Sequence, residues 1–345
     1  ALGALVVNIR YRARARERSV VLALLLVLTM KLIIQITAWN EEEHLPETLA
    51  ALPSGIDGID DIEVLVIDDG STDRTAEVAR EGGAEVVRMP VHRGLAVAFS
   101  TGLRSAVERG ADVVVNTDAD NQYDARDIPA LVKPILDGSA QMVIGDRQVA
   151  TLRHFSPIKR VLQKLGSWVV RRISGTSVKD ATSGFRAVSR SAALRLHVFT
   201  RFTYTLETIL QAGEAGLKVV SVPVRVNAGE LRPSRLFQSD VGYVLRSLAS
   251  MARIVTLYNP LRIFLMLGAV PVLLGCSLLV RFLHFFLAGI SPAGHVQSLI
   301  LAVILVVIGA LVWLAGVMAD LTAVNRRLLE ELVMRQRERG LEDPR

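Results

Sequence analysis

The sequence contains a single cysteine among 345 residues, Cys276, and this residue lies inside an apolar run. One thiol cannot form a disulfide within the chain, and it cannot supply a cysteine-based zinc site. Aromatic residues are also few, at 5% of the chain, and the basic residues are dispersed rather than interleaved with aromatic ones. We therefore expect no nucleic-acid-binding module and no nucleic-acid partner.

The composition is nevertheless too apolar for an ordinary soluble enzyme, with 51% hydrophobic residues and a mean hydropathy of +0.38. The apolar excess is concentrated after residue 261. The formal net charge is +6 and the sequence pI is near 9.8. A basic balance of this kind suits an anionic membrane surface or phosphate-bearing substrates.

A short apolar run at residues 113–115 is followed by Asp118, Asp120 and Gln122. A valine-rich run of this length is typical of a buried parallel strand. Alternate side chains of an extended segment point the same way, so these three are expected to converge where open α/β sheets bind ligands. Two carboxylates and an amide oxygen suit Mg²⁺ or Mn²⁺. The alternative is an ordinary polar loop after a strand.

Predicted strands and helices alternate from residue 31 onward. Strands are expected over residues 32–36, 63–67, 85–88, 113–115 and 142–144, and helices over residues 41–52, 95–109 and 127–137. Ser71 or Thr72 is expected to cap a further helix that reaches about residue 81. Repeated βα units of this kind predict an α/β fold with a doubly wound parallel sheet.

Residues 158–173 form a predicted amphipathic helix. Its apolar stripe consists of Ile158, Val161, Leu162, Leu165, Trp168 and Val169, and the opposite face is largely basic. Such a stripe usually packs against its own domain. The basic face and Trp168 fit equally a helix that lies among lipid headgroups, so both interpretations stay open.

Two long apolar segments, residues 261–283 and 299–319, predict membrane-spanning helices. The second has 21 residues without a charge, and a helix of that length is about 31 Å long, enough to cross the hydrocarbon core. Two such runs side by side disfavour the alternative, a buried hairpin in a soluble protein. Residues 284–298 contain no Lys or Arg, whereas both flanks carry several Arg. The positive-inside rule then predicts both ends, and the preceding domain, on the cytoplasmic face.

The two ends of the sequence carry weaker signals. In residues 1–29 a basic cluster precedes a short apolar run, which indicates an upstream extension or a surface-lying segment rather than a span. Residues 320–339 predict a charged amphipathic helix. Its apolar side is expected to pack on the domain or on a second subunit, which leaves a homo-oligomer open.

Four motifs follow one another along the chain. They are Ala-Trp-Asn-Glu-Glu-Glu at 38–43, Asp-Asp-Gly-Ser-Thr-Asp at 68–73, Asp-Ala-Asp-Asn-Gln at 118–122 and Asp-Ala-Thr-Ser-Gly-Phe-Arg at 180–186. Together they resemble the family 2 glycosyltransferases with a GT-A fold, and more narrowly the polyprenyl-phosphate glycosyltransferases related to dolichyl-phosphate mannose synthase. The resemblance covers roughly residues 31–235, and the two-helix tail is similar to one branch of that group.

The resemblance implies an integral membrane enzyme whose catalytic domain has a Rossmann-like, mostly parallel sheet. The implied parts are a leader at 1–29, a GT-A domain at 30–235, a juxtamembrane helix at 236–260, two transmembrane helices within 261–319, and a C-terminal helix and tail at 320–345. The implied partners are a nucleotide sugar, a polyprenyl phosphate and membrane lipids.

The resemblance also implies the donor side of the site. The residues that match nucleotide-binding positions are Ala38, Trp39, Glu41, Asp68, Asp69, Asp118, Arg232 and Arg235. The metal-binding positions, for Mg²⁺ or Mn²⁺, are matched by Asp118, Asp120 and Gln122. One acid of the 68–69 pair would accept the ring N–H of the base, and the late basic loop would close over the diphosphate. From the residues alone, a capped turn explains the first of these segments and a basic linker explains the second.

On the acceptor side, the positions that match catalytic residues are Asp120, Arg147, Arg160 and Asp180, and those near the sugar and acceptor are Ser183 and Glu207. Arg147 and Arg160 would bind the acceptor phosphate, while Asp180 would orient the sugar or assist the acceptor. From the residues alone, Arg160 is also explained by a basic helix face, and Glu207 by a surface charge on a helix at 204–212.

The implied reaction is an inverting, metal-dependent transfer of a sugar from a GDP- or UDP-linked donor to a polyprenyl phosphate. The family usually has Pro at the place of Thr37 and often Tyr at that of Trp39, and these two differences leave the base open. Beside Arg147 it often has Ser at the place of Asp146. A processive polysaccharide synthase would carry a Gln-x-x-Arg-Trp motif, which is absent. A transferase with a non-lipid acceptor, a sugar-1-phosphate nucleotidyltransferase and a membrane scaffold with an inactive domain remain as alternatives.

Overall fold

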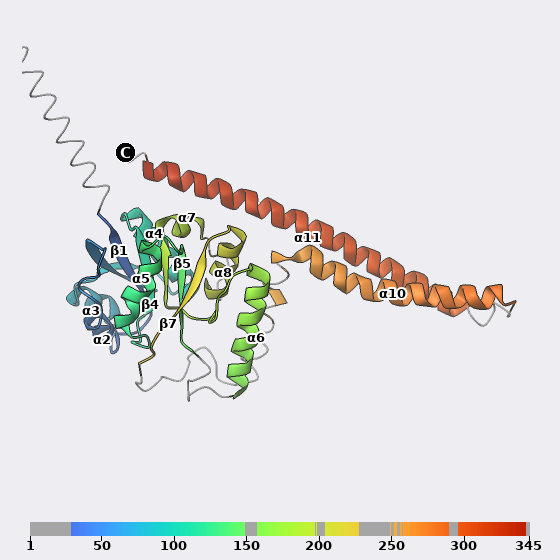
Figure 1. Ribbon diagram of the computed structural model, residues 1–345, viewed down its shortest axis with the longest axis horizontal. Helices are drawn as coiled ribbons and strands as arrows, with labels where there is room; N and C mark the ends of the chain where they lie inside the picture. Colours follow the sequence, from blue (N-terminus) through green and yellow to red (C-terminus); the bar gives the residue numbers. More distant parts are fainter. Residues whose placement is uncertain are drawn as a thin grey trace, which may run out of the picture. The chain divides into compact units, whose positions relative to one another are not determined.

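The computed structural model of the protein describes residues 29–148, 157–196, 198, 204–227, 249, 252–253, 256, 258–289 and 296–342 (Figure 1). The chain forms two compact units, Ala1–Leu231 and Arg232–Arg345. Some predictions fall outside the described residues: those for the leader up to residue 28, for Arg232 and Arg235, and for most of the juxtamembrane helix. The side chain of Arg160 is also outside them.

A seven-stranded sheet forms the centre of the first unit. Its strands are β1 (Lys31–Ala38), β2 (Asp61–Asp68), β3 (Glu85–Arg88), β4 (Val113–Asp118), β5 (Met142–Asp146), β6 (Arg186–Ser189) and β7 (Val219–Pro223). Their order across the sheet is β3-β2-β1-β4-β6-β5-β7. Neighbouring strands are parallel except at β6, which runs antiparallel to β4 and β5. The predicted mostly parallel sheet is thus confirmed, and β6 is its antiparallel strand.

The helices of this unit are α2 (Leu45–Ala50), α3 (Thr75–Glu81), α4 (Leu95–Glu108), the 3-10 helix η1 (Ala125–Asp127), α5 (Ile128–Leu136), α6 (Pro157–Ser174), α7 (Arg190–Arg195) and α8 (Tyr204–Glu214). Helix α4 begins at Leu95, directly after Gly94, which agrees with the helix predicted over residues 95–109. The expected cap of α3 is wrong, because the helix begins three residues later than Thr72, at Thr75. There the Thr75 N–H donates to the Asp73 carboxylate at 3.0 Å.

Helices cover both faces of the sheet (Figure 1). On one face, Leu32, Ile34 and Ile36 of β1 join the buried side chains of α2, α3 and α5 in one apolar core. On the other face, the Gln35 amide of β1 donates to the Phe99 carbonyl of α4 at 3.1 Å, and the Phe99 ring stacks on Tyr204 of α8. The side chains on both faces of β1 are therefore buried, as is usual for a central parallel strand.

The sequence patterns do not predict β6, α7 or β7, which have only four to six residues each. Strand β6 begins with Arg186, whose side chain is buried, and a buried arginine interrupts the apolar pattern of a central strand. This strand also returns between β4 and β5 in the opposite direction, so a simple count of βα units cannot find it.

The second unit contains two long helices, α10 (Pro260–Leu287) and α11 (Val296–Glu342). Glycines let the two backbones approach each other closely. A Cβ atom added to Gly268 would lie 2.5 Å from the Trp313 ring, and one added to Gly309 would lie 2.7 Å from the Gly268 carbonyl oxygen. Contacts between small residues of this kind are typical of helix pairs inside membranes.

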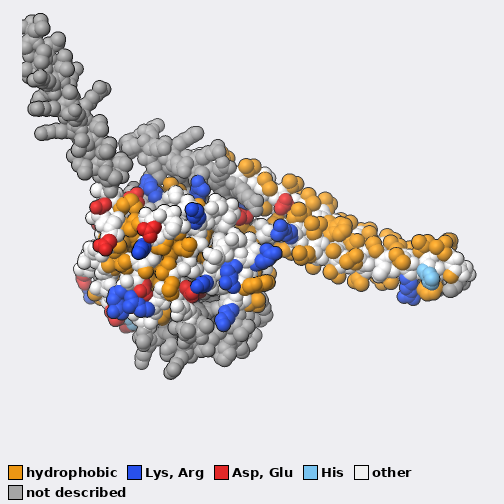
Figure 2. Space-filling model, in the orientation of Figure 1, with side chains coloured by type: hydrophobic (Ala, Val, Ile, Leu, Met, Phe, Trp, Pro, Cys, Tyr) orange, Lys and Arg blue, Asp and Glu red, His pale blue; other side chains and the backbone are white. Residues whose placement is uncertain are grey.

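Pro260–Leu287 and Val296–Arg326 are long and apolar enough to cross a membrane. Only 11% and 17% of their most apolar windows are buried within the described structure, and Figure 2 shows the surface of this helix pair to be largely hydrophobic. A buried hairpin of a soluble protein would cover these side chains, so the exposed apolar surface favours membrane association. Helix α11 continues to Glu342, so the helix expected at 320–339 is its continuation and not a separate element.

Candidate active site

The carboxyl ends of β1, β2 and β4 meet at one edge of the sheet. Parallel pairing puts Ala38 beside Asp68 and Thr37 beside Asp118. Three of the four motifs therefore begin at the same edge, which is where open α/β sheets bind ligands.

The loops after β1 and β2 are tied to each other by hydrogen bonds. Asn40, with a φ of 53°, lies in the left-handed region. Its N–H donates to the Ser71 hydroxyl at 2.9 Å, and its side-chain oxygen accepts from the Thr72 N–H at 2.9 Å. The Glu41 N–H donates to the Thr75 hydroxyl at 2.9 Å. Ser71 and Thr72 thus hold the loop after β1, which is a different role from the predicted helix cap.

The Asp68-Asp69 pair is held largely by its own chain. Asp68 is fully buried; its carboxylate accepts from the Ser71 N–H at 2.8 Å and lies 3.2 Å from the Arg88 guanidinium. Asp69 accepts from the backbone N–H groups of Arg93 and Gly94, both at 2.8 Å. These contacts match the capped-turn interpretation. A contact between Asp68 or Asp69 and the base of a nucleotide stays a prediction.

An aromatic pair lies beside these acids. The Trp39 ring stacks on the His92 ring, with centroids 4.1 Å apart and planes inclined by 23°. The His92 Nδ1 atom lies 2.9 Å from the Asp69 carboxylate, which fixes the ring. Trp39 is 38% exposed. Sequence reasoning missed His92, because nothing in its local pattern indicates that it meets Trp39 from another loop.

The acidic segment after β4 is a turn and not an extended continuation of the strand. The strand ends at Asp118, and Asn121 adopts a φ of 53°. The Asp120 carboxylate accepts from the Gln122 N–H at 3.1 Å, closing a tight local turn. The argument from alternating strand side chains is therefore wrong for Asp120 and Gln122, although all three residues lie at the predicted end of the strand.

The electrostatics of this turn come from two nearby carboxylates. Burial, together with the charge of Asp120, raises the pKa of Asp118 to about 7, against the opposing effect of Arg147 and Arg186. A cation between the two acids would relieve their repulsion. Among the described residues no cluster of three or more His, Cys, Asp or Glu side chains can hold a metal ion. Asp118, Asp120 and Gln122 bring oxygen donors to this end of the strand, and a cation held by them stays a prediction.

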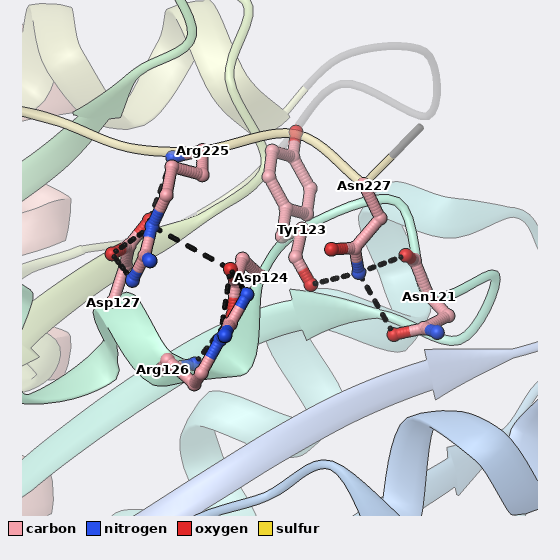
Figure 3. A network of polar contacts seen from close by, with 7 residues as sticks. All are labelled: Asn121, Tyr123, Asp124, Arg126, Asp127, Arg225 and Asn227. Carbon is pink, nitrogen blue, oxygen red and sulfur yellow. Dashed lines mark hydrogen bonds and ion pairs between the residues drawn. The ribbon is translucent and has the colours of Figure 1, made fainter. Parts of the chain in front are cut away.

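A network of polar contacts joins the turn after β4 to residues 225–227 (Figure 3). The Asn227 side-chain amide donates to the carbonyl oxygens of Asn121 at 2.8 Å and Tyr123 at 3.3 Å. The Asn227 N–H donates to the Gln122 carbonyl at 2.9 Å. One asparagine thus binds the backbone of three successive residues beside the acidic pair.

The same network continues along the chain through charged groups. The Arg225 guanidinium donates to the Asp127 carboxylate at 2.6 and 3.0 Å, and it lies 3.5 Å from Asp124 (Figure 3). Asp124 also accepts from Arg126, which is largely exposed. Residues 225–227 are therefore bound to residues 121–127 both through Arg225 and through Asn227.

We expect Asn227→Ala to weaken Mn²⁺ binding by about tenfold, because the loss of two part-buried hydrogen bonds costs about 1–3 kcal/mol and loosens the turn that presents Asp120. Titration of Mn²⁺ by electron paramagnetic resonance measures this change. Arg126→Ala is the matched control, since its side chain belongs to the same network but is 75% exposed. Equal affinity in the wild type and the Asn227 variant would remove the positioning role.

Arg147 and Asp180 form a buried ion pair. The guanidinium donates to the carboxylate at 2.7 and 3.0 Å, and to the Thr182 hydroxyl at 2.8 Å. Burial alone would raise the pKa of Asp180, but Arg147 outweighs it and the pKa falls below its ordinary value. The two residues that the sequence assigns to separate tasks thus hold each other, which limits how far either can turn toward a substrate.

The segment that follows Asp180 approaches the acidic turn through its backbone. The Gly184 N–H donates to the Tyr123 hydroxyl at 3.1 Å, and its carbonyl accepts from the Asn116 amide at 2.9 Å. Ser183 is fully buried, and its hydroxyl has no hydrogen-bond partner within the described residues. A Cβ atom on Gly184 would lie 3.1 and 3.2 Å from the Asp118 carboxylate oxygens and 2.9 Å from the Tyr204 hydroxyl.

We expect Gly184→Ala to lower the transfer rate by roughly 10- to 100-fold, because the added methyl group displaces the Asp118 carboxylate and a small displacement of a reacting group is enough for such a loss. Crowding against the buried Tyr204 hydroxyl should also cost about 1–3 kcal/mol of stability. Steady-state rates and thermal unfolding together test this. Gly55→Ala is the control, since a Cβ there meets nothing within 4 Å. Equal rates in the two variants would contradict a role for the close contact with Asp118.

Several buried polar residues behind the site escape sequence reasoning. Gln35 donates to Asn116 at 2.9 Å, and Asn116 in turn lies 3.2 Å from the Tyr204 hydroxyl. The Arg186 guanidinium donates to the Thr208 hydroxyl at 2.7 Å and to the Ser183 carbonyl. A polar residue inside an apolar strand, as Gln35 and Asn116 are, is the one signal that points to such a network.

Glu207 belongs to this interior. It is 1% exposed, so the interpretation of Glu207 as a surface charge is wrong. Its helix is as predicted, because α8 spans Tyr204–Glu214. A buried carboxylate needs a specific structural or chemical reason, and the proposed acceptor contact stays a prediction.

Comparison with known proteins identifies the family. The sequence model described as Glycosyl transferase family 2 matches residues 33–196. An uncharacterized glycosyltransferase of Mycobacterium tuberculosis is 38% identical over 186 residues, which is 54% of this chain and 80% of that protein. The chain belongs to glycosyl transferase family 2. This family 2 enzyme contains in its second unit two helices long and apolar enough to cross a membrane.

The names of two further relatives state an activity. The chain is 29% identical to the undecaprenyl-phosphate mannosyltransferase of Micrococcus luteus, covering 62% of this chain and 90% of that one. It is 28% identical to the polyprenol monophosphomannose synthase of Mycolicibacterium smegmatis, covering 62% and 83%. Among solved structures, glucosyl-3-phosphoglycerate synthase of Mycobacterium tuberculosis has a TM-score of 0.51 at 24% identity, covering 64% of this chain and 80% of that chain. This last likeness concerns the GT-A fold alone.

Proposed function

We propose that this family 2 glycosyltransferase transfers a sugar from a nucleotide diphosphate sugar to a polyprenyl phosphate, with inversion at the anomeric carbon. The observation that carries the proposal is the meeting of the motifs from β1, β2 and β4 at one sheet edge, in a chain with two candidate membrane spans. The names of two relatives, an undecaprenyl-phosphate mannosyltransferase and a polyprenol monophosphomannose synthase, support the lipid acceptor.

On the donor side, Trp39 and His92 offer a flat aromatic surface on which the nucleotide base can stack. Asp68 or Asp69 would accept the ring N–H of the base, at which guanine and uracil are alike. Ala38 and Glu41 would border the ribose. Arg232 and Arg235 would bind the diphosphate, since paired arginine donors suit phosphate oxygens.

Asp118, Asp120 and Gln122 would hold a Mg²⁺ or Mn²⁺ ion, to which their oxygen donors and the repulsion between the two acids are suited. When bound, the ion would neutralise the negative charge of the diphosphate leaving group. The Asp120 turn and its Asn227 contacts keep the donors in position before the substrate arrives.

On the acceptor side, a phosphate monoester is already ionised near neutral pH, so no strong base is needed. An oxygen of the lipid phosphate attacks the anomeric carbon, and the bond from that carbon to the nucleotide diphosphate breaks. Arg147 and Arg160 would orient the attacking phosphate, Asp180 would fix Arg147, and Ser183 and Glu207 would border the sugar. Catalysis would then consist of positioning and charge stabilisation.

The two candidate spans would keep the domain at the membrane surface where the lipid phosphate lies. Arginines lie near the beginning of α10 and in the C-terminal part of α11, whereas residues 284–298, which include the connection between the two helices, contain no Lys or Arg. By the positive-inside rule we propose that the catalytic domain lies on the cytoplasmic face.

The experiment is a panel of nucleotide sugars with radiolabelled sugar, each offered to the purified chain with Mn²⁺ and a polyprenyl phosphate. The expected result is that the label from one donor becomes lipid-soluble, and that the sugar of this product has the inverted anomeric configuration. Label that appears only in a water-soluble product would indicate a non-lipid acceptor. If no donor is consumed in the presence of cation and lipid, the proposal is wrong and an inactive scaffold becomes the better account.

A further inference from the structure

Helix α6 turns its largest described apolar side chains away from its own domain. Trp168 is 55% exposed and Leu165 is 45% exposed. The residues of α6 that are buried are small or medium in size, namely Gly166, Ser167, Val170 and Ser174. An amphipathic helix that served only to cover the domain would have the opposite arrangement.

The inward face of α6 packs closely against α8 and against the backbone at Ala181. A Cβ atom on Gly213 of α8 would overlap the Ser174 carbonyl oxygen, so the two helices touch through their backbones. The Ser167 hydroxyl accepts from the Ala181 N–H at 3.2 Å. A rotation of α6 that buried Trp168 would break both contacts, so the outward position of the tryptophan is built into the fold.

The charge of α6 has one sign. Its sequence contains five basic residues and no acidic one: Lys159, Arg160, Lys164, Arg171 and Arg172. Lys164 and Arg172 are exposed and stand one helical turn before and after Trp168, on the same face. The outward face therefore combines a tryptophan and a leucine with flanking cations. Such a face is complementary to an anionic surface with apolar material directly beneath it.

We propose that the outward face of α6 lies on the surface of an anionic lipid bilayer, with Trp168 among the headgroups and Lys164 and Arg172 against lipid phosphates. The same chain supplies two helices that can enter that bilayer. Binding of a soluble protein partner would not explain why a helix with charge of only one sign occurs in a chain with two candidate membrane spans. The inference goes beyond the proposed reaction and does not depend on which sugar is transferred.

The test uses the full chain reconstituted in phosphatidylcholine vesicles with and without phosphatidylglycerol. A variant in which Trp39 and Trp313 are replaced by Phe leaves Trp168 as the sole tryptophan. Lipids brominated near the glycerol and near the chain end report the depth of the ring. We expect the shallow bromines to quench Trp168 several-fold more than the deep ones, with stronger quenching when phosphatidylglycerol is present. A chain that keeps only Trp313, in α11, is the control and should be quenched most by the deep bromines.

Lys164→Glu combined with Arg172→Glu should remove most of the shallow quenching and shift the Trp168 emission to longer wavelength. The proposal would be overturned if brominated lipids did not quench Trp168 fluorescence while acrylamide in the solvent quenched it fully. A blue shift that depends on protein concentration and not on lipid would also overturn it, because that indicates a second copy of the chain. The measurement needs no turnover, so an inactive sample that is still quenched would count against the proposed function alone.

Discussion

Asp120→Ala is expected to lower the rate of sugar transfer by roughly 10³-fold or more. Removal of one of two carboxylates from the turn after β4 takes away a donor for the cation, and a loss of several kcal/mol of charge stabilisation corresponds to a factor of ten for each 1.4 kcal/mol or so. Asp120 is exposed, and its carboxylate accepts from the Gln122 N–H within the same turn. The fold should therefore survive the change.

Initial rates with a labelled nucleotide sugar, together with melting temperatures, measure both parts of this expectation. Asp57→Ala is the matched control, because Asp57 is also an exposed acid but precedes the amino end of β2, away from the site edge. Transfer by the Asp120 variant within a few-fold of wild type would rule out the cation assignment. A large fall in melting temperature would show instead that the turn is chiefly structural.

The second large effect concerns the buried pair of Arg147 and Asp180. Arg147→Met leaves an uncompensated carboxylate that is 4% exposed, and breaking a buried ion pair in this way costs about 3–5 kcal/mol. For a domain of this size we expect the melting temperature to fall by roughly 6–20 °C. Transfer should also be lost, because the arginine proposed to orient the acceptor phosphate is gone.

The double variant Arg147→Met with Asp180→Asn separates these two effects. With neither charge present, much of the lost stability should return, since a buried pair is often nearly neutral relative to uncharged replacements. Transfer should not return. A double variant as unstable as the single one would show that the two side chains do not stabilise each other. Recovery of transfer with recovery of stability would deny Arg147 any contact with substrate.

The sequence predicts those parts of the fold that depend on regular patterns. The valine-rich run of β4, the helix after Gly94 and the long apolar runs of α10 and α11 all follow from periodicity and length. Strand β6 does not, because Arg186 lies in it and is buried by contacts with residues far along the chain, among them Thr208. Long-range compensation of a buried charge leaves no mark on a local pattern.

Some features of the candidate site can likewise be predicted from local sequence patterns, and others cannot. Asp118 and Asp120 are found from the sequence because two carboxylates after a buried strand already suggest a hard oxygen site. The turn that brings Asp120 back depends on Asn121 and on Asn227, which lies more than a hundred residues later. The pairing of Arg147 with Asp180 and the stacking of Trp39 on His92 likewise join separate loops. These contacts could be read only from the three-dimensional arrangement.

The central claim is that a divalent cation at the end of β4 holds the diphosphate of the donor. Crystals of the full chain grown with Mn²⁺ and a nucleoside diphosphate, measured for the anomalous scattering of manganese, test it most directly. The account predicts an anomalous peak beside the carboxylates of Asp118 and Asp120, in contact with the diphosphate. A peak elsewhere, or a diphosphate bound away from this edge of the sheet, would contradict it.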